Sequence, residues 1–191
     1  MPKLGMGPIR RQQLVEAAIT VIHQYGLANA TVARIAKRAG VSSGIVHHYF
    51  ADKDELLFAT MRSLLAELHR DTVARQRDAR TPRQRVNAVI DASFGDAQFD
   101  EEVFSAWLAL YGNARQSERL RGILTLYHRR LHANLMHDLV RLMDRPRAAR
   151  LAEGIAAMID GLWLRYALAG KPPNPEHPRA ITRAYFEAAG N

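Results

Sequence analysis

Four residues that lack a large apolar side chain recur at helical spacing between positions 43 and 48. Ser43, Gly44, His47 and His48 fall on one arc of a helix with about 3.6 residues per turn. Hydroxyl and imidazole groups donate hydrogen bonds to phosphate oxygens and base edges, and glycine lets a helix backbone approach a partner closely. This set of side chains suits contact with nucleic acid, and a face that is merely solvated is the alternative.

Two short helices and a glycine turn are expected to position these residues. Thr31 is a plausible N-cap, and the residues that follow it at helical spacing form an apolar stripe. Gly40 supplies a left-handed exit from the first helix, and Ser42 is expected to cap the second. The inward residues are Val32, Ile35, Ala36 and Ala39, then Val46, Tyr49 and Phe50. This pattern, from Thr31 to Phe50, is typical of a helix-turn-helix.

Positive charge is concentrated around this segment. The chain has a net charge of +8, and residues 1–50 hold six Lys or Arg against Glu16 alone, so they account for +5 of it. A basic region around a helix-turn-helix favours binding to the DNA backbone over a basic helix on acidic lipid. We expect residues 1–8 to form a basic arm, with Lys3 and then Arg10 placed for a minor groove. A frayed terminus without a role is the alternative.

Composition restricts the class of protein. The 191 residues contain no cysteine, which excludes disulfides, thiolate metal sites and cysteine nucleophiles and suits the cytoplasm. The chain has no long uncharged apolar run and no secretory signal pattern, so we predict a cytoplasmic protein with no membrane segment.

The sequence lacks the common signatures of catalysis and cofactor binding. Neither the dinucleotide fingerprint GxGxxG nor the phosphate loop GxxxxGK[ST] occurs. His128 and His132 have the i, i+4 spacing of a metal pair, but no acidic third ligand is obvious. We therefore predict no enzyme, no cofactor and no metal. An all-helical enzyme and an architectural DNA binder without a sensor remain as alternatives.

Apolar residues recur at helical spacing along the whole chain, and no stretch alternates with period two. The sequence predicts an all-α fold of about nine helices. A first helix over Ile9 to Tyr25 and the two short helices form an N-terminal unit, and a long helix from Asp52 to about Asp78 links it to the rest. Further helices are expected at about 82–94, 101–111, 117–143, 146–168 and 178–189. The helix at 146–168 is apolar nearly all round, which indicates that a partner subunit covers it.

The stretch TVARIAKRAGVSSGIVHHYFADKDELL resembles the TetR family of one-component transcriptional repressors in the spacing of its turn, recognition helix and Asp-Lys. The match is strongest over residues 9–57. PKLGM with PIRRQQLVEA near the start and MIDGLWLRYALAGKP near the end are similar to a choline-responsive subgroup that represses glycine betaine synthesis. The resemblance implies a DNA-binding repressor with a DNA-binding domain at 1–55 and a ligand-binding and dimerisation domain at 56–191.

The resemblance also implies roles for the polar residues of the helix-turn-helix. Positions matching these residues touch phosphates in the family: Thr31, Ser42, His48, Tyr49 and Lys53. Positions matching Ser43, Gly44 and His47 approach bases, but many relatives have other residues at two of them, so no base preference is carried over. The family dimerises through its last two long helices, here about 146–168 and 178–189, so the operator is expected to be an inverted repeat.

Choline is the effector that the resemblance implies. A quaternary ammonium has no N–H to donate and is held by aromatic ring faces and a carboxylate. Trp107 and Tyr111 lie four residues apart on one expected helix, and Asp160 and Trp163 lie three apart on another. We expect these four residues to contribute to the effector site, although aromatic residues at such spacing also form cores, and the partner subunit's Arg165 is another possible partner for Asp160. The alternative effector is a bulkier cationic drug, with the repressor controlling an efflux pump.

Overall fold

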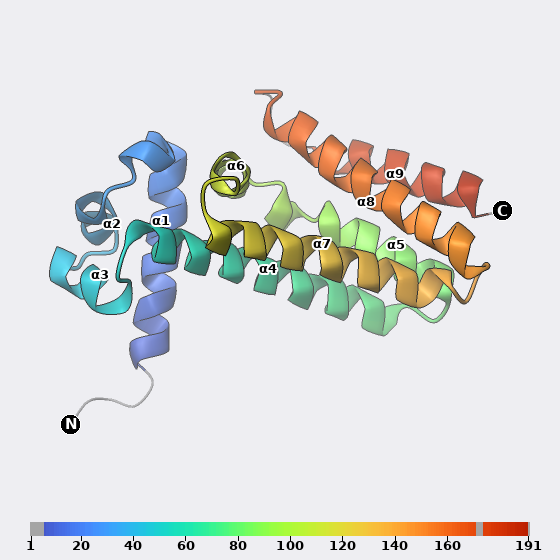
Figure 1. Ribbon diagram of the computed structural model, residues 1–191, viewed down its shortest axis with the longest axis horizontal. Helices are drawn as coiled ribbons and strands as arrows, with labels where there is room; N and C mark the ends of the chain where they lie inside the picture. Colours follow the sequence, from blue (N-terminus) through green and yellow to red (C-terminus); the bar gives the residue numbers. More distant parts are fainter. Residues whose placement is uncertain (1–5, 171–173, 191) are drawn as a thin grey trace. The chain divides into compact units, whose positions relative to one another are not determined.

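The described part of the chain is built from helices. The computed structural model describes residues 6–170 and 174–190, which contain nine α-helices, one short 3₁₀ helix and no β-strand (Figure 1). The elements are α1 (Met6–Asn29), α2 (Val32–Arg38), α3 (Ser43–Tyr49), α4 (Lys53–Asp78), α5 (Pro82–Ser93), η1 (Asp96–Gln98), α6 (Glu101–Asn113), α7 (Glu118–Leu139), α8 (Arg145–Ala167) and α9 (Glu176–Ala189). The predicted all-α fold is confirmed.

Side-chain caps begin four of these helices where the sequence suggests them. Each capping oxygen accepts a hydrogen bond from a backbone N–H of the first turn, a contact typically worth about 1 kcal/mol. The bonds are Arg34 N to Thr31 Oγ1 at 3.3 Å, Glu55 N to Asp52 Oδ1 at 2.6 Å, Gln84 N to Thr81 Oγ1 at 3.2 Å and Arg147 N to Asp144 Oδ1 at 2.9 Å. The prediction for Ser42 is wrong in part, because it occupies the N-cap position of α3 without a side-chain hydrogen bond.

Two helices begin earlier than predicted. Helix α1 starts at Met6, so residues 6–8 are helical and the predicted arm over 1–8 is wrong for that part; α9 starts at Glu176, two residues before Pro178. In both helices a proline occupies the third helical position, where its missing N–H has no partner within the helix. Proline is therefore compatible with the first turn, and residues 1–5 of the predicted arm lie outside the described residues.

Two glycines separate the N-terminal helices. Gly26 has φ 72° and ψ 159°, which interrupts α1 near the end predicted for it, and Gly40 has φ 66° after α2. Other residues rarely adopt such positive φ angles. Further along, helix α7 ends at Leu139, earlier than the predicted 143, because i to i−3 hydrogen bonds tighten the chain into turns there. The predicted loop after α5 contains η1.

Packing divides the chain into two compact units. Unit 1 contains the described residues of 1–64 together with 101–123, and unit 2 contains 65–100 and the described residues of 124–191. The division falls within α4 and α7, so each of these helices has residues in both units. Helix α6 belongs to unit 1 and packs on α1, where Thr20 Oγ1 donates to Glu102 Oε2 at 3.0 Å. The predicted boundary at residue 55, between a DNA-binding domain and a ligand-binding and dimerisation domain, stays a prediction.

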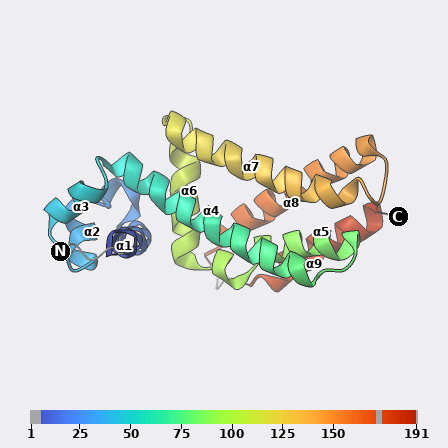
Figure 2. The same ribbon diagram turned by 90° about the horizontal axis from the view of Figure 1, so that it is seen from below.

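The core of unit 2 is formed by α5, α8, α9 and the parts of α4 and α7 that belong to it. Helices α8 and α9 run side by side, and α5 lies against α9 (Figures 1 and 2). Gly154 permits the close approach of α8 to α9, since a Cβ there would meet the Tyr185 hydroxyl. Among the described residues, no helix is both long and apolar enough to cross a bilayer.

Candidate DNA-contacting surface and effector site

Helix α3 presents the predicted DNA-contacting residues on its outer side. Ser43, Gly44, His47 and His48 are all exposed. Val46 and Phe50 point the other way and are about 1% and 2% exposed, which fixes the rotation of the helix against unit 1. The predicted division between inner and outer residues is confirmed for Val46 and Phe50, whereas Tyr49 is only half-buried.

Gly44 has no role in the packing of its own chain. A Cβ added there would meet only the Ser42 hydroxyl, at 3.8 Å, which is an ordinary contact distance. Glycine also disfavours a helix relative to other residues by about 1 kcal/mol. Neither space nor backbone conformation in the free protein requires glycine at this position, and its predicted role of close approach to DNA stays a prediction.

The residues predicted to touch phosphates lie in or near α3, but their side chains differ in exposure and in the contacts that they already make. The Ser42 side chain is exposed, and the Thr31 hydroxyl caps α2 while keeping its own hydrogen available. Tyr49 is half-buried, with the ring of His48 against its edge at 5.2 Å. The Lys53 ammonium donates to the carbonyl oxygens of residues 27 and 28, at the end of α1. Lys53 therefore already has partners in the free protein.

Part of the basic charge in unit 1 is used for packing. Arg11 lies over the Phe50 ring at 4.8 Å, and Arg34 lies over the Tyr25 ring at 4.4 Å while donating to the Asn29 carbonyl at 2.7 Å. Arg10 belongs to α1 rather than to an arm, and Lys3 lies outside the described residues. The net charge of +5 therefore overstates the number of cations available to phosphates.

One predicted effector pair lies in unit 1. The rings of Trp107 and Tyr111 on α6 are 6.0 Å apart and tilted by 32°, as their i, i+4 spacing requires. Trp107 is buried and about 4% exposed, whereas Tyr111 is half-buried. The Trp107 ring is therefore closed to a cation unless surrounding side chains move.

The other predicted pair lies in unit 2, where Asp160 has two partners from α7. The Tyr127 hydroxyl donates to Asp160 Oδ1 at 2.8 Å, and His128 Nε2 lies 3.3 Å from Asp160 Oδ2. Burial raises the pKa of the Asp160 carboxyl, and the contacts with Tyr127 and His128 oppose that rise. The Trp163 indole N–H donates to the Gln98 carbonyl at 3.2 Å, so this ring is fixed against the segment after α5.

Tyr127 and His128 are the members of this cluster that sequence analysis missed. His128 is exposed, with about half of its side chain accessible, and it also pairs with Asp160. Nothing in the spacing within α7 or α8 says which turn of one helix faces which turn of the other. Only the unusual carboxylate on an apolar helix signalled that such partners existed.

Comparisons with known proteins decide the family. Residues 14–60 match the family model described as bacterial regulatory proteins of the tetR family, and residues 82–190 match that of the BetI-type transcriptional repressor, C-terminal. The chain belongs to the TetR family. It is a BetI-type transcriptional repressor and not an enzyme.

Relatives of this TetR-family chain extend over nearly its whole length. It is 49% identical over 186 residues to the HTH-type transcriptional regulator BetI of Brucella anthropi, covering 97% of this chain and 96% of that one. It is 48% identical to the BetI regulator of Rhizobium meliloti, covering 98% and 93% of the two chains. The efflux-pump alternative is not favoured by these relatives.

Solved structures share the fold of this TetR-family chain. A transcriptional regulator from Pseudomonas aeruginosa PAO1 superposes with a TM-score of 0.83 at 25% identity, covering 96% of this chain and 91% of that one. A transcriptional regulator from Saccharomonospora viridis in complex with choline has a TM-score of 0.79 at 21% identity, covering 93% and 95%. TetR-family regulators bind operator DNA as dimers. In the described residues of this member, no three potential metal ligands gather.

Proposed function

We propose that this TetR-family repressor controls the synthesis of glycine betaine from choline, with choline as the effector, in the cytoplasm. The observation that carries the proposal is the 49% identity to a BetI regulator over 97% of the chain. The carboxylate of Asp160, in a polar cluster with Tyr127 and His128, supplies a group that suits a quaternary ammonium. The structure in complex with choline is that of a regulator 21% identical to this chain, so it supports only the chemical plausibility of a choline site in this fold.

We propose that the dimer forms through α8 and α9. Large apolar side chains stay exposed on these two helices and at the C-cap of α8 in the single chain: Leu164 is about 40%, Leu168 about 66% and Tyr185 about 37% exposed. Apolar surface of this kind is expected to be buried by the same surface of a second copy in a twofold interface. Two α3 helices related by a twofold axis then meet an inverted repeat, with half-sites spaced by whole helical turns.

Footprinting on the DNA that flanks the gene of this protein tests the proposed function. The expected result is protection of an inverted repeat by two protomers, with the protection altered by choline. A ligand changes the occupancy only through its different affinities for the DNA-competent and DNA-incompetent states. Protection that choline leaves unchanged, and that a bulky cationic drug removes, would contradict the choline assignment.

Lys53→Ala is expected to weaken operator binding about equally across sequences and to reduce the salt slope by about one. The reason is that an ammonium at the start of α4 neutralises a phosphate without contacting a base. Gel-shift titrations at several salt concentrations, on the operator and on unrelated DNA, measure both quantities.

Because Lys53 also bonds the end of α1, a structural role must be separated from a phosphate contact. Lys53→Met keeps much of the aliphatic stem and serves as the second variant, and urea unfolding reports the stability of both. An unchanged salt slope together with a lower free energy of unfolding would assign Lys53 to the structure of unit 1 alone.

Asp160→Asn is expected to lower the affinity for choline about tenfold at neutral pH, because the ionised carboxylate attracts the quaternary ammonium. Burial raises the pKa of Asp160 above its ordinary value of 3.8, so the carboxylate becomes fully ionised only at higher pH than an exposed aspartate. Choline affinity of the wild type therefore rises as the pH is raised through that pKa, and calorimetry between about pH 4.5 and pH 7.5 measures the rise.

The Asp160→Asn variant also serves as the control for the pH series. Asp160→Asn removes the carboxylate, so the part of the pH dependence that it causes disappears, whereas Glu187→Gln, at an exposed position of α9, should retain the wild-type curve. Trp107→Ala tests the pair on α6 separately, since Trp107 and Asp160 belong to different compact units. Wild-type affinity in both Trp107→Ala and Asp160→Asn would remove these residues from the choline site.

A further inference from the structure

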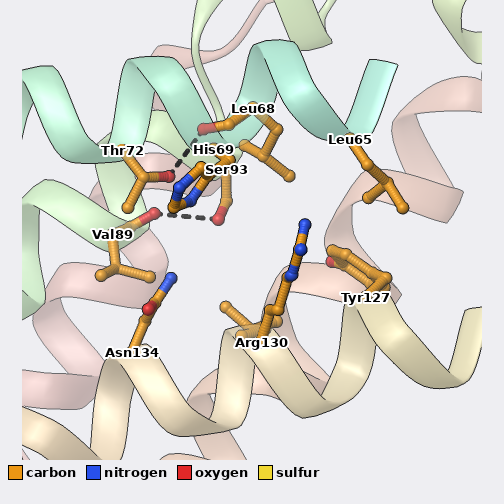
Figure 3. A pocket seen from close by; sticks show the side chains of 10 residues that line it. Leu65, Leu68, His69, Thr72, Val89, Ser93, Tyr127, Arg130 and Asn134 are labelled. Atoms are coloured by element: carbon orange, nitrogen blue, oxygen red, sulfur yellow. Dashed lines mark hydrogen bonds between the residues drawn. The ribbon is translucent and has the colours of Figure 1, made fainter. Parts of the chain in front are cut away.

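The two compact units contain spaces of different size. The space within unit 2, among α4, α5 and α7, has a volume of about 30 Å³, and the Thr72 and Ser93 hydroxyls on its wall donate to carbonyls of their own helices (Figure 3). That volume holds a water molecule or two. Unit 1 contains a groove of about 310 Å³ between α1 and α2, which lie side by side (Figures 1 and 2). This groove has the size of a small-molecule site.

The walls of the groove between α1 and α2 carry charges of both signs. Arg10 and Glu16 come from α1, and Arg38 comes from the last turn of α2. Two positive charges therefore face the groove together with one negative charge. Gln13 and Thr20 add a carboxamide and a hydroxyl. Groups of this kind can hold an anionic and a cationic part of one ligand at the same time.

The charges in this groove do not pair with one another. Within the described residues Glu16 has no ion pair, and its carboxylate accepts one hydrogen bond, from Gln12 Nε2 at 3.1 Å. Arg10 donates to Gln13 Oε1 at 2.9 Å. The Arg38 side chain is exposed and makes no hydrogen bond, ion pair or ring contact with the described chain. Both guanidinium groups thus lie beyond ion-pair distance of the Glu16 carboxylate.

A ligand with a single charge fits this arrangement poorly. The Glu16 carboxylate would repel a simple anion, and the two guanidinium groups would repel a simple cation. A zwitterion suits both signs, because its carboxylate accepts charge-assisted hydrogen bonds from arginine and its ammonium donates to Glu16. None of the described residues that line the groove is aromatic, so a protonated amine with N–H groups fits better than a quaternary ammonium.

We propose that the groove between α1 and α2 binds a small zwitterion, whose carboxylate is held by Arg10 and Arg38 and whose protonated amine is held by Glu16. Ala17 and Ala39 also line the groove and offer apolar surface to a short methylene chain between the two charges. The site lies wholly within unit 1, which also carries α3. The zwitterion site does not rest on the proposed response to choline.

NMR titration of the isotope-labelled full chain with γ-aminobutyrate tests the proposal. Butyrate lacks the ammonium of this zwitterion, and propylamine lacks its carboxylate. We expect saturable shifts of the Ala17 and Ala39 amide signals with a dissociation constant of about 1 mM or below, and at least about tenfold weaker binding of either control compound. No saturable shift with γ-aminobutyrate, or equal affinity for butyrate or propylamine, would overturn the proposal.

Arg38→Gln is expected to weaken γ-aminobutyrate binding about tenfold, because it removes a charge-assisted partner of the carboxylate. Lys37→Gln is the matched control, since Lys37 is exposed on the same helix and does not line the groove. The amide spectrum of each variant reports whether the fold is intact. An equal loss of affinity in the two variants would show an effect of overall charge and contradict a site in the groove.

Glu16→Gln separates the ammonium from the carboxylate of the ligand. It is expected to weaken γ-aminobutyrate binding about tenfold, whereas butyrate should bind equally well or more tightly, because the repulsion between two carboxylates is removed. Loss of affinity for both compounds would contradict the role given to Glu16.

DNA phosphates are the alternative occupant of the groove, since unit 1 also carries α3. A salt slope of operator binding lower by about one in Arg38→Gln would assign the groove to phosphates and overturn the proposal, which predicts an unchanged slope. Choline lacks a carboxylate and is expected not to displace γ-aminobutyrate; displacement would refute the zwitterion site. If choline binds nowhere on the protein, the proposed effector fails while the result with γ-aminobutyrate stands.

Discussion

Arg85→Met is expected to lower the free energy of unfolding by about 3 kcal/mol, because it leaves a buried carboxylate without its main partner. Asp138 is completely buried, and Arg85 Nε donates to both of its oxygens, at 3.1 and 3.0 Å. His137 and Arg141 lie at 3.2 and 3.6 Å and retain part of the compensation, which places the loss near the lower end of the usual range. Urea denaturation followed by circular dichroism measures it.

Two further variants separate the effect of leaving a buried carboxylate unpaired from the effect of removing an arginine side chain. Arg75→Met breaks an ion pair with Asp71 in which both side chains are more than a third exposed, and the expected loss is no more than about 1 kcal/mol. Arg85→Met combined with Asp138→Leu removes both charges and should recover roughly 2 kcal/mol of the single-variant loss. A loss for Arg85→Met no greater than that for Arg75→Met would contradict the burial argument.

Helix positions were predictable because the information that fixes them is local. Thr31, Asp52, Thr81 and Asp144 each precede an apolar stripe at helical spacing, and each caps the helix that follows. The errors concern helix ends, where a residue that is compatible with more than one position of the first turn was assigned to the wrong position. Pro178, for example, was taken as the start of α9, but a proline is equally compatible with the third position of the first turn.

Contacts between helices were not predictable from spacing alone. Helical spacing did not indicate that the Tyr127 hydroxyl on α7 would meet Asp160 on α8. Periodicity likewise gave no sign that α6 packs on α1 and belongs to unit 1, because it says which face is buried and not against what. The residues predicted for the effector site therefore form two pairs, each on one face of its helix, and their assignment to that site stays a prediction.

The polar arc of α3 was predictable for a different reason. Its rotation follows from two apolar residues, Val46 and Phe50, whose burial forces the other side of a short helix outward. The arc does not indicate which bases it prefers, because serine and histidine side chains form hydrogen bonds with several base edges. The structure adds one fact that the sequence lacked, namely that only the Ser42 hydroxyl, at 3.8 Å, lies within 4 Å of a Cβ added at Gly44.

Gly44→Leu is therefore expected to lower operator affinity by at least about a hundredfold, or roughly 3 kcal/mol, while leaving the fold intact. A leucine side chain at this exposed position of α3 would hold the helix backbone away from the base edges that it is proposed to approach. Its Cβ has room in the free protein, with only the Ser42 hydroxyl at 3.8 Å, so the free energy of unfolding should be unchanged or slightly higher. Gel shifts and urea unfolding measure the two quantities.

Gly122→Leu is the matched control, because Gly122 is also exposed within a helix of unit 1 and an added Cβ there meets nothing within 4 Å. It should show the same small gain in helix stability with wild-type operator affinity. Non-specific binding of Gly44→Leu at low salt should persist, since attraction to phosphates acts at longer range than base contact. Operator affinity of Gly44→Leu within about threefold of that of Gly122→Leu would show that α3 does not bring its backbone to the bases, and the role proposed for Ser43 and His47 beside it would fall as well.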